Sequence, residues 1–258
     1  MRRRAVAEIG RHEAALIRSE PLPVAAYLVM PIVLMAFVED SFGVYLRFVE
    51  GLPDVSGALL AVPGQATMFA FMSTATLGYY YLGEHSWGTW NRMRALGVTS
   101  GEIVTGKLSI AYVQQLVQLA LLFGVGMLAF GLRVEGSVLG LAAVAAAFAL
   151  FVVAYGFLAC AISRSQAQFN AFAYVGALLL AGLGGALVPF GTLPGWVQAI
   201  GRFTPTYWAV RGFRAALLER GATSTIVAAV LVLVVGAVVT MGLALWRFDP
   251  DERKSTYA

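Results

Sequence analysis

Six long stretches of the sequence contain no charged residue, and they limit the possible folds more than any other feature. These stretches are residues 21–38, 57–83, 108–132, 136–163, 165–201 and 221–246. A helix that crosses a hydrocarbon core of about 30 Å needs ~20 predominantly apolar residues. The stretches are rich in Ala, Leu, Val and Phe, and they lack the alternation of an outer-membrane barrel strand. They predict an all-α membrane protein with six transmembrane helices.

The composition agrees with a membrane protein and argues against two kinds of site. Hydrophobic residues make up 59% of the chain and charged residues 12%, whereas a soluble domain has about 25% charged residues. The single cysteine excludes an internal disulfide, and the two histidines lie far apart outside the charge-free stretches, so no metal site is predicted. We expect residues 1–258 to form one domain, with the membrane region at 21–246 and a cytoplasmic tail at 247–258.

The distribution of Arg and Lys predicts the orientation of the helices. Counted over alternate loops, twelve of the 18 Lys and Arg residues fall on the side that holds both termini, and six fall on the other side. Short loops rich in Arg and Lys stay in the cytoplasm. We therefore expect both termini to be cytoplasmic.

Residues 1–20 carry a separate membrane signal. Val6, Ile9, Leu16 and Ile17 fall roughly on one face of a helix, and basic residues lie among polar neighbours elsewhere on it. This pattern is typical of an amphipathic helix at a membrane surface. We expect residues 1–20 to lie on the cytoplasmic leaflet as an interfacial helix.

The fifth charge-free stretch is too long for one crossing. Pro and Gly residues interrupt it from residue 189 onward, after a predicted span at about 169–188. Irregular backbone survives at membrane depth only where protein or water shields it. We expect residues 193–201 to form a short helix in a re-entrant or external excursion between the fifth and sixth spans.

Polar side chains inside the spans are few, and none in the middle of a span is ionisable. Four of them are candidates for lining a substrate pathway, although hydrogen bonds between helices explain such residues equally well. They are Gln65, Thr74, Gln114 and Gln118. Proton-coupled transporters place ionisable groups at depth. The spans therefore suggest a pathway whose energy comes from elsewhere.

The densest polar region between spans is the loop at residues 84–107, EHSWGTWNRMRALGVTSGEIVTGK. It predicts a short helix at 87–96, followed by a helix that Thr99 and Glu102 open as a capping box. Lys107 then lies at the start of the third span, where a long side chain can extend to the interface. The end of the loop resembles a nucleotide-binding loop, but Leu108 replaces the required hydroxyl and no strand precedes it. We do not predict nucleotide binding there.

This loop and a later segment resemble the permease subunits of ABC exporters of the ABC-2 type. The loop matches the pattern E-x-x-x-G-T-x-x-[RL], then a [PG]-[VL]-[ST] turn, then G-K at the start of the third span. The matching residues are Glu84, Gly88, Thr89, Arg92, Gly97, Val98, Thr99, Glu102, Gly106 and Lys107. The second motif follows the fifth span and comprises Leu193, Pro194, Trp196, Pro205, Tyr207 and Arg211. This copy has Gly97 where many relatives have Pro.

The resemblance implies a function and a set of partners. It implies a cytoplasmic coupling helix that docks on a separate ABC ATPase, present in two copies, which binds the ATP and Mg while this chain binds no cofactor. It also implies a second permease, either another copy of this chain or a similar chain. The implied location is a bacterial inner membrane, and no nucleic-acid partner is implied. The implied coupling residues are Glu84, Gly88, Thr89, Arg92, Met93, Arg94, Gly97 and Val98.

Several functions remain open from the sequence alone. The first is export of an amphipathic drug or lipid-like substrate, and polysaccharide or glycolipid export by a permease of the same architecture is its alternative. A membrane-embedded enzyme acting on lipids would draw on Glu39, Asp40 and Arg47, or on Arg211 and Arg214. A third possibility is a membrane partner that recruits an ATPase without transporting anything.

Overall fold

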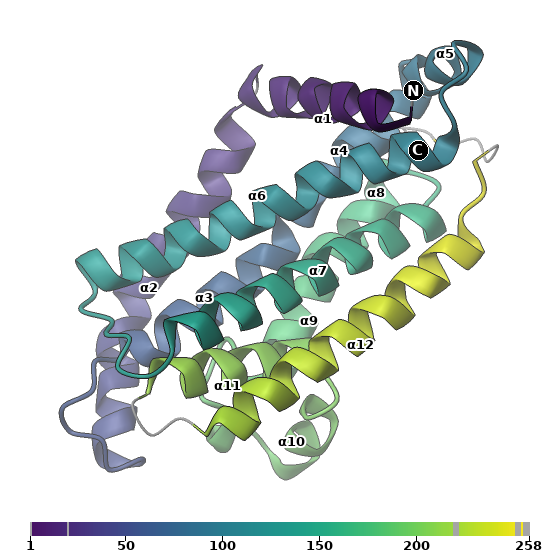
Figure 1. Ribbon diagram of the computed structural model, residues 1–258. Helices are drawn as coiled ribbons and strands as arrows, with labels where there is room; N and C mark the ends of the chain where they lie inside the picture. The colour runs from purple at the N-terminus through teal and green to yellow at the C-terminus, as the bar shows by residue number, and fades with distance from the viewer. Residues whose placement is uncertain (1, 20, 219–221, 251–253, 255–258) are drawn as a thin grey trace.

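The computed structural model describes residues 2–19, 21–218, 222–250 and 254, and within them the chain forms helices and no strand (Figure 1). Most of the long helices run together as a bundle. One end of the bundle carries α1 (Arg2–Ser19) and the short α5 (Thr89–Ala95), and the other carries α10 (Gly195–Gly201). We call these the α5 end and the α10 end. The predicted all-α fold is confirmed.

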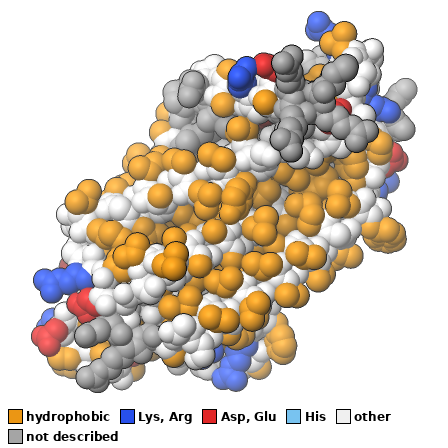
Figure 2. All heavy atoms as spheres, viewed as in Figure 1, with side chains coloured by type: hydrophobic (Ala, Val, Ile, Leu, Met, Phe, Trp, Pro, Cys, Tyr) orange, Lys and Arg blue, Asp and Glu red, His pale blue; other side chains and the backbone are white. Residues whose placement is uncertain are grey.

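Five helical stretches among the described residues are long and apolar enough to cross a membrane. They are Ala25–Phe48, Ala58–Ser86, Ser100–Ala129, Val138–Ile162 and Thr223–Arg247. They correspond to α2 (Pro21–Phe48), α3 (Ala58–Met72) with α4 (Thr74–Ser86), α6 (Ser100–Ala129), α7 (Val138–Ile162) and α12 (Thr223–Arg247). Figure 2 shows hydrophobic side chains over the middle of one face and charged side chains towards its two ends, as expected of a surface that lies in lipid.

The predicted fifth span is a helical run of three consecutive elements with a π-helical turn in the middle. It consists of α8 (Gln166–Asn170), a π-helical turn (Ala171–Val175) and α9 (Gly176–Leu183). None of these pieces alone is long enough for a crossing. The six-span topology therefore stays a prediction, with five candidate spans found. After α9 the chain forms α10 and then α11 (Pro205–Leu217), which lead to α12.

The second span, Ala58–Ser86, lies at the centre of the bundle. Within its most apolar 18 residues, 94% of the residues are buried by the rest of the chain. The span is interrupted at Ser73, between α3 and α4. Ser73 Oγ donates to the carbonyl of Ala70 (2.9 Å), and Thr74 Oγ1 donates to that of Phe71 (2.6 Å). From α6, Gln115 Nε2 donates to Ala70 O (3.0 Å) and Ser73 Oγ (2.8 Å). These bonds satisfy the backbone and hydroxyl groups at the break inside an apolar bundle.

Candidate functional site

The short helix α5 lies between two glycine turns at the α5 end. Gly88 precedes α5 with a φ of 73°, and Gly97 follows it with a φ of 85°. Only glycine adopts such a left-handed backbone without strain. Thr99 then caps α6, with Glu102 N donating to Thr99 Oγ1 (3.3 Å) and Thr99 N donating to Glu102 Oε2 (2.9 Å). The predicted capping box is confirmed.

The two sides of α5 differ sharply in exposure. Trp90 is 1% exposed and Leu96, just after the helix, is 84% exposed. The ring of His85 stacks on Trp90 with a centroid distance of 4.5 Å, and the ring of Tyr81 lies 5.8 Å away. Arg92 is exposed. α5 is therefore fixed to the bundle by Trp90 and presents its opposite side to the surroundings.

A buried cluster of three charges lies beside α5. Lys107 of α6 forms ion pairs with Glu84 of α4, at 2.9 Å, and with Glu13 of α1. The side chains of Lys107, Glu84 and Glu13 are 1%, 3% and 6% exposed. A buried cation is tolerated only where opposite charges and hydrogen bonds offset its lost hydration. We call Glu13, Glu84 and Lys107 the charge triad; it joins three helices whose residues are far apart in sequence.

The burial of Lys107 corrects one expectation. Its side chain was expected to extend to the membrane interface, but it turns into the protein and meets two carboxylates. The reason is that α1 packs against the start of α6 and brings Glu13 within reach. Glu13 and Trp90 are further residues of this site that were not among the predicted coupling residues.

The structure brings the predicted coupling residues together at the α5 end. Thr89 Oγ1 donates to the carbonyl of Glu84 (3.3 Å), and Val98 N donates to the carbonyl of Met93 (3.1 Å). Met93 and Val98 pack against the apolar cluster that contains Trp90. Their role in coupling stays a prediction.

A prediction about the two turn glycines follows from their backbone angles. Replacing Gly88 or Gly97 by Ala should destabilise the protein by about 1 kcal/mol each, because a Cβ strains the left-handed conformation while open space surrounds both positions. Gly101→Ala is the control, since Gly101 lies in the first turn of α6 with open space around it. Thermal unfolding of the purified variants measures the difference, and equal melting temperatures for all three would contradict it.

Two of the four predicted pathway residues line the same small cavity. Thr74 and Gln114 line a small cavity of about 10 Å³, which is room for roughly one water molecule. Gln118 Nε2 donates to the carbonyls of Tyr27 and Phe69, both at 3.2 Å, and so ties α6 to α2 and α3. Gln65 is buried in α3. Contact of these side chains with substrate stays a prediction.

The residues of the second motif lie just before α10, in α10 and in α11, on either side of the turn that joins these helices. Thr204 caps α11, with Pro205 at its first turn. Arg211 donates to the hydroxyl of Tyr207 (3.0 Å) and lies 5.7 Å from the ring of Trp208. Gln198 Nε2 donates to the carbonyl of Leu193 (2.8 Å), beside Pro194. Trp196 is exposed on α10.

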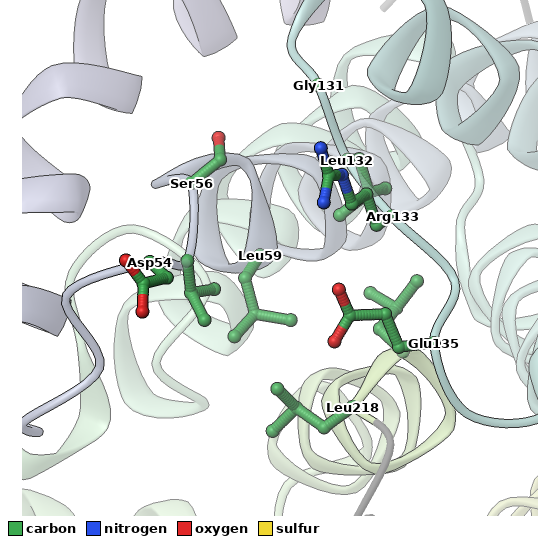
Figure 3. A pocket seen from close by; sticks show the side chains of 10 residues that line it. Asp54, Ser56, Leu59, Gly131, Leu132, Arg133, Glu135 and Leu218 are labelled. Atoms are coloured by element: carbon green, nitrogen blue, oxygen red, sulfur yellow. The ribbon is translucent and has the colours of Figure 1, made fainter.

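A separate cavity of about 240 Å³ opens at the α10 end of the molecule (Figure 3). Asp54, Arg133 and Glu135 line it from the loops that follow α2 and α6, and all three side chains are exposed. In the described parts of the chain, no group of His, Cys, Asp and Glu side chains is placed to hold a metal ion.

The residues that would serve a lipid-modifying enzyme have separate partners. Glu39 accepts a hydrogen bond from Ser56 (2.7 Å), Arg214 pairs with Glu50 (2.6 Å), and Arg211 contacts Tyr207. Asp40 and Arg47 are exposed on α2. These contacts hold helices and loops together at the α10 end.

Comparison with known proteins gives one clear result. A family model described as ABC-2 type transporter matches residues 9–218, which include the charge triad, α5 and the turn between α10 and α11. No curated protein gives a significant sequence match. The match covers most of the chain, and the chain therefore belongs to the ABC-2 type transporter family, as a membrane component of a transporter.

Proposed function

We propose that this chain is the permease subunit of an ABC exporter and that α5 is the helix that docks on its ATPase. One observation carries the proposal: the seven-residue helix α5 exposes Arg92, and Leu96 just after it is exposed too, while Trp90 on the other side is buried against the bundle. A helix this short is not stable alone, so tertiary contacts must hold it. A rigidly held, exposed helix suits the transfer of motion from a partner protein.

The charge triad supports transfer of that motion into the membrane region. Glu84 lies at the end of α4, a few residues before α5, and its carboxylate pairs with Lys107 of α6. Glu13 attaches α1 to the same ammonium group. A displacement of α5 would act on α4, and through Lys107 on α6 and α1.

The remaining features of the proposal concern topology and partners. The α5 end lies in the cytoplasm, α8 to α9 complete a sixth span, and α10 with α11 lie at the outer surface of a bacterial inner membrane. Two copies of this chain, or this chain with a similar one, pair with two ATPase subunits that bind the ATP and Mg. The substrate is an amphipathic drug or lipid-like molecule, since the spans offer apolar surface with few polar groups.

The first test is retention of the ATPase. The tagged chain is purified from its native membrane in mild detergent, and Mg-ATP hydrolysis in the eluate is measured per mole of chain. Arg92→Glu should lower the retained hydrolysis about tenfold, because it reverses an exposed charge in the docking surface. Arg133→Glu is the matched control at the α10 end, where the same reversal should have no effect. Equal retention by Arg92→Glu and the wild type would contradict the proposal.

A further inference from the structure

Phe248 and Pro250, which follow α12, contact α5 at the α5 end. The carbonyl of Pro250 accepts hydrogen bonds from Trp90 Nε1 (3.2 Å) and Arg94 (3.4 Å). The ring of Phe248 lies 6.3 Å from that of Trp90 and 5.6 Å from that of Phe157 in α7. We call residues 248–250 together with Lys254 the return segment. It lies outside the residues that the family model matches.

Lys254 anchors the return segment on the end of α7. Its Nζ donates to the carbonyls of Cys160 (2.9 Å), Ser163 (2.8 Å) and Ala161 (3.4 Å), and the residue is 6% exposed. The last four carbonyls of a helix have no partner within the helix. An ammonium group offers three donors, and its charge is favourable at the negative end of the helix dipole. Lys254 therefore caps α7, which ends at Ile162.

The return segment thus contacts both α5 and the end of α7. Trp90 and Arg94 lie about 160 positions before Pro250 in the chain. The ring of Phe248 lies edge-on to that of Trp90 in α5 and is tilted against that of Phe157 in α7. Because α5 is too short to be stable alone, these contacts help to set its position.

We propose that the return segment is a positioning element of the ATPase-coupling site, with Lys254 as its anchor. Lys254 holds the segment against α7, and Pro250 and Phe248 in turn hold Trp90 and Arg94. A displacement of α5 by a docked ATPase then reaches α7 and α12 as well as the helices of the charge triad. This inference rests on the proposed function.

The test measures hydrogen exchange of the full chain in lipid nanodiscs, first without the ATPase. Lys254→Met removes the donors while keeping the length of the side chain, and the backbone amides of residues 89–97 should then exchange about tenfold faster. Lys254→Arg keeps the charge and should retain most of the protection. Arg11→Met is the control, because Arg11 is exposed on α1 and pairs with Glu8 three positions earlier; it should leave α5 unchanged.

A second variant guards against general unfolding. Phe248→Ala removes the ring contacts with Trp90 and Phe157 without changing any charge, and it should loosen α5 in the same local pattern. Unchanged exchange at residues 89–97 in both variants would overturn the inference. Equal loosening of every helix in both variants would overturn it as well, because it would make the segment a general stabiliser.

The purified complex with the ATPase supplies the functional readout. Addition of Mg-ATP should change exchange in the last turn of α7 in the wild type, and Lys254→Met should reduce that change at least about threefold. ATPase retention should fall much less, since the exposed side of α5 is untouched. If the wild type retains no ATPase, the proposed function fails while the measurement on the chain alone still decides whether the return segment positions α5.

Discussion

Replacing Lys107 by Met should lower the free energy of unfolding by about 3–5 kcal/mol. The substitution leaves the carboxylates of Glu13 and Glu84 buried beside each other without their shared cation. Removing one partner of a buried ion pair costs more than the pair contributes, because the remaining charge loses its compensation. Here one ammonium group serves two carboxylates, so the loss is at the upper end of the range.

Neutralising the whole cluster provides the decisive comparison. The triple variant Lys107→Met, Glu13→Gln, Glu84→Gln should recover most of the lost stability, since no charge is left buried. Arg11→Met is the control for loss of a cation on an exposed surface, and it should change stability by less than about 0.5 kcal/mol. Unfolding in mild detergent, followed by tryptophan fluorescence, measures all four proteins. A triple variant no more stable than Lys107→Met would show that the triad does not act through charge compensation.

The membrane helices were predictable because their signal is local. A charge-free stretch of about 20 apolar residues is long enough to cross the bilayer. This local pattern identifies α2, α6, α7 and α12 directly. The cap of α6 was predictable for the same reason, since Thr99 and Glu102 lie three residues apart and need no other part of the chain. The predicted helix at 87–96 differs from α5 (Thr89–Ala95) only at its ends, where Gly88 and Gly97 set the turns.

The contacts that build the candidate site were not predictable in this way. A lysine at the start of a span is equally suited to extend outward or to pair inside. The outcome here depends on Glu84 and on Glu13, which lies 94 positions earlier. The break at Ser73 depends likewise on Gln115 from another helix. Lys254 belongs to residues expected to form a tail, and its three acceptors lie more than 90 positions earlier. Such pairings depend on how the helices pack, which the local pattern does not contain.

Gly64→Ala should destabilise the protein by about 3 kcal/mol, the second largest effect that we expect. Gly64 lies within α3, and a Cβ placed there would be 2.3 Å from the carbonyl oxygen of Ala186. That oxygen belongs to the backbone of the turn after α9, which a hydrogen bond from Ala186 N to Ala181 O (2.9 Å) holds in place. A flexible side chain could move aside, but this backbone cannot move without shifting α3 or the turn that leads to α10.

Gly124→Ala is the matched control for this prediction. Gly124 also lies inside a membrane-spanning helix, α6, but a Cβ there would meet nothing within 4 Å. Alanine should then stabilise the helix by about 0.5 kcal/mol, because it loses less backbone freedom on folding than glycine does. The two variants therefore make the same chemical change with opposite expected signs, and unfolding midpoints measured side by side compare them. A Gly64→Ala protein as stable as Gly124→Ala would mean that α3 and the turn after α9 do not approach as closely as the structure places them.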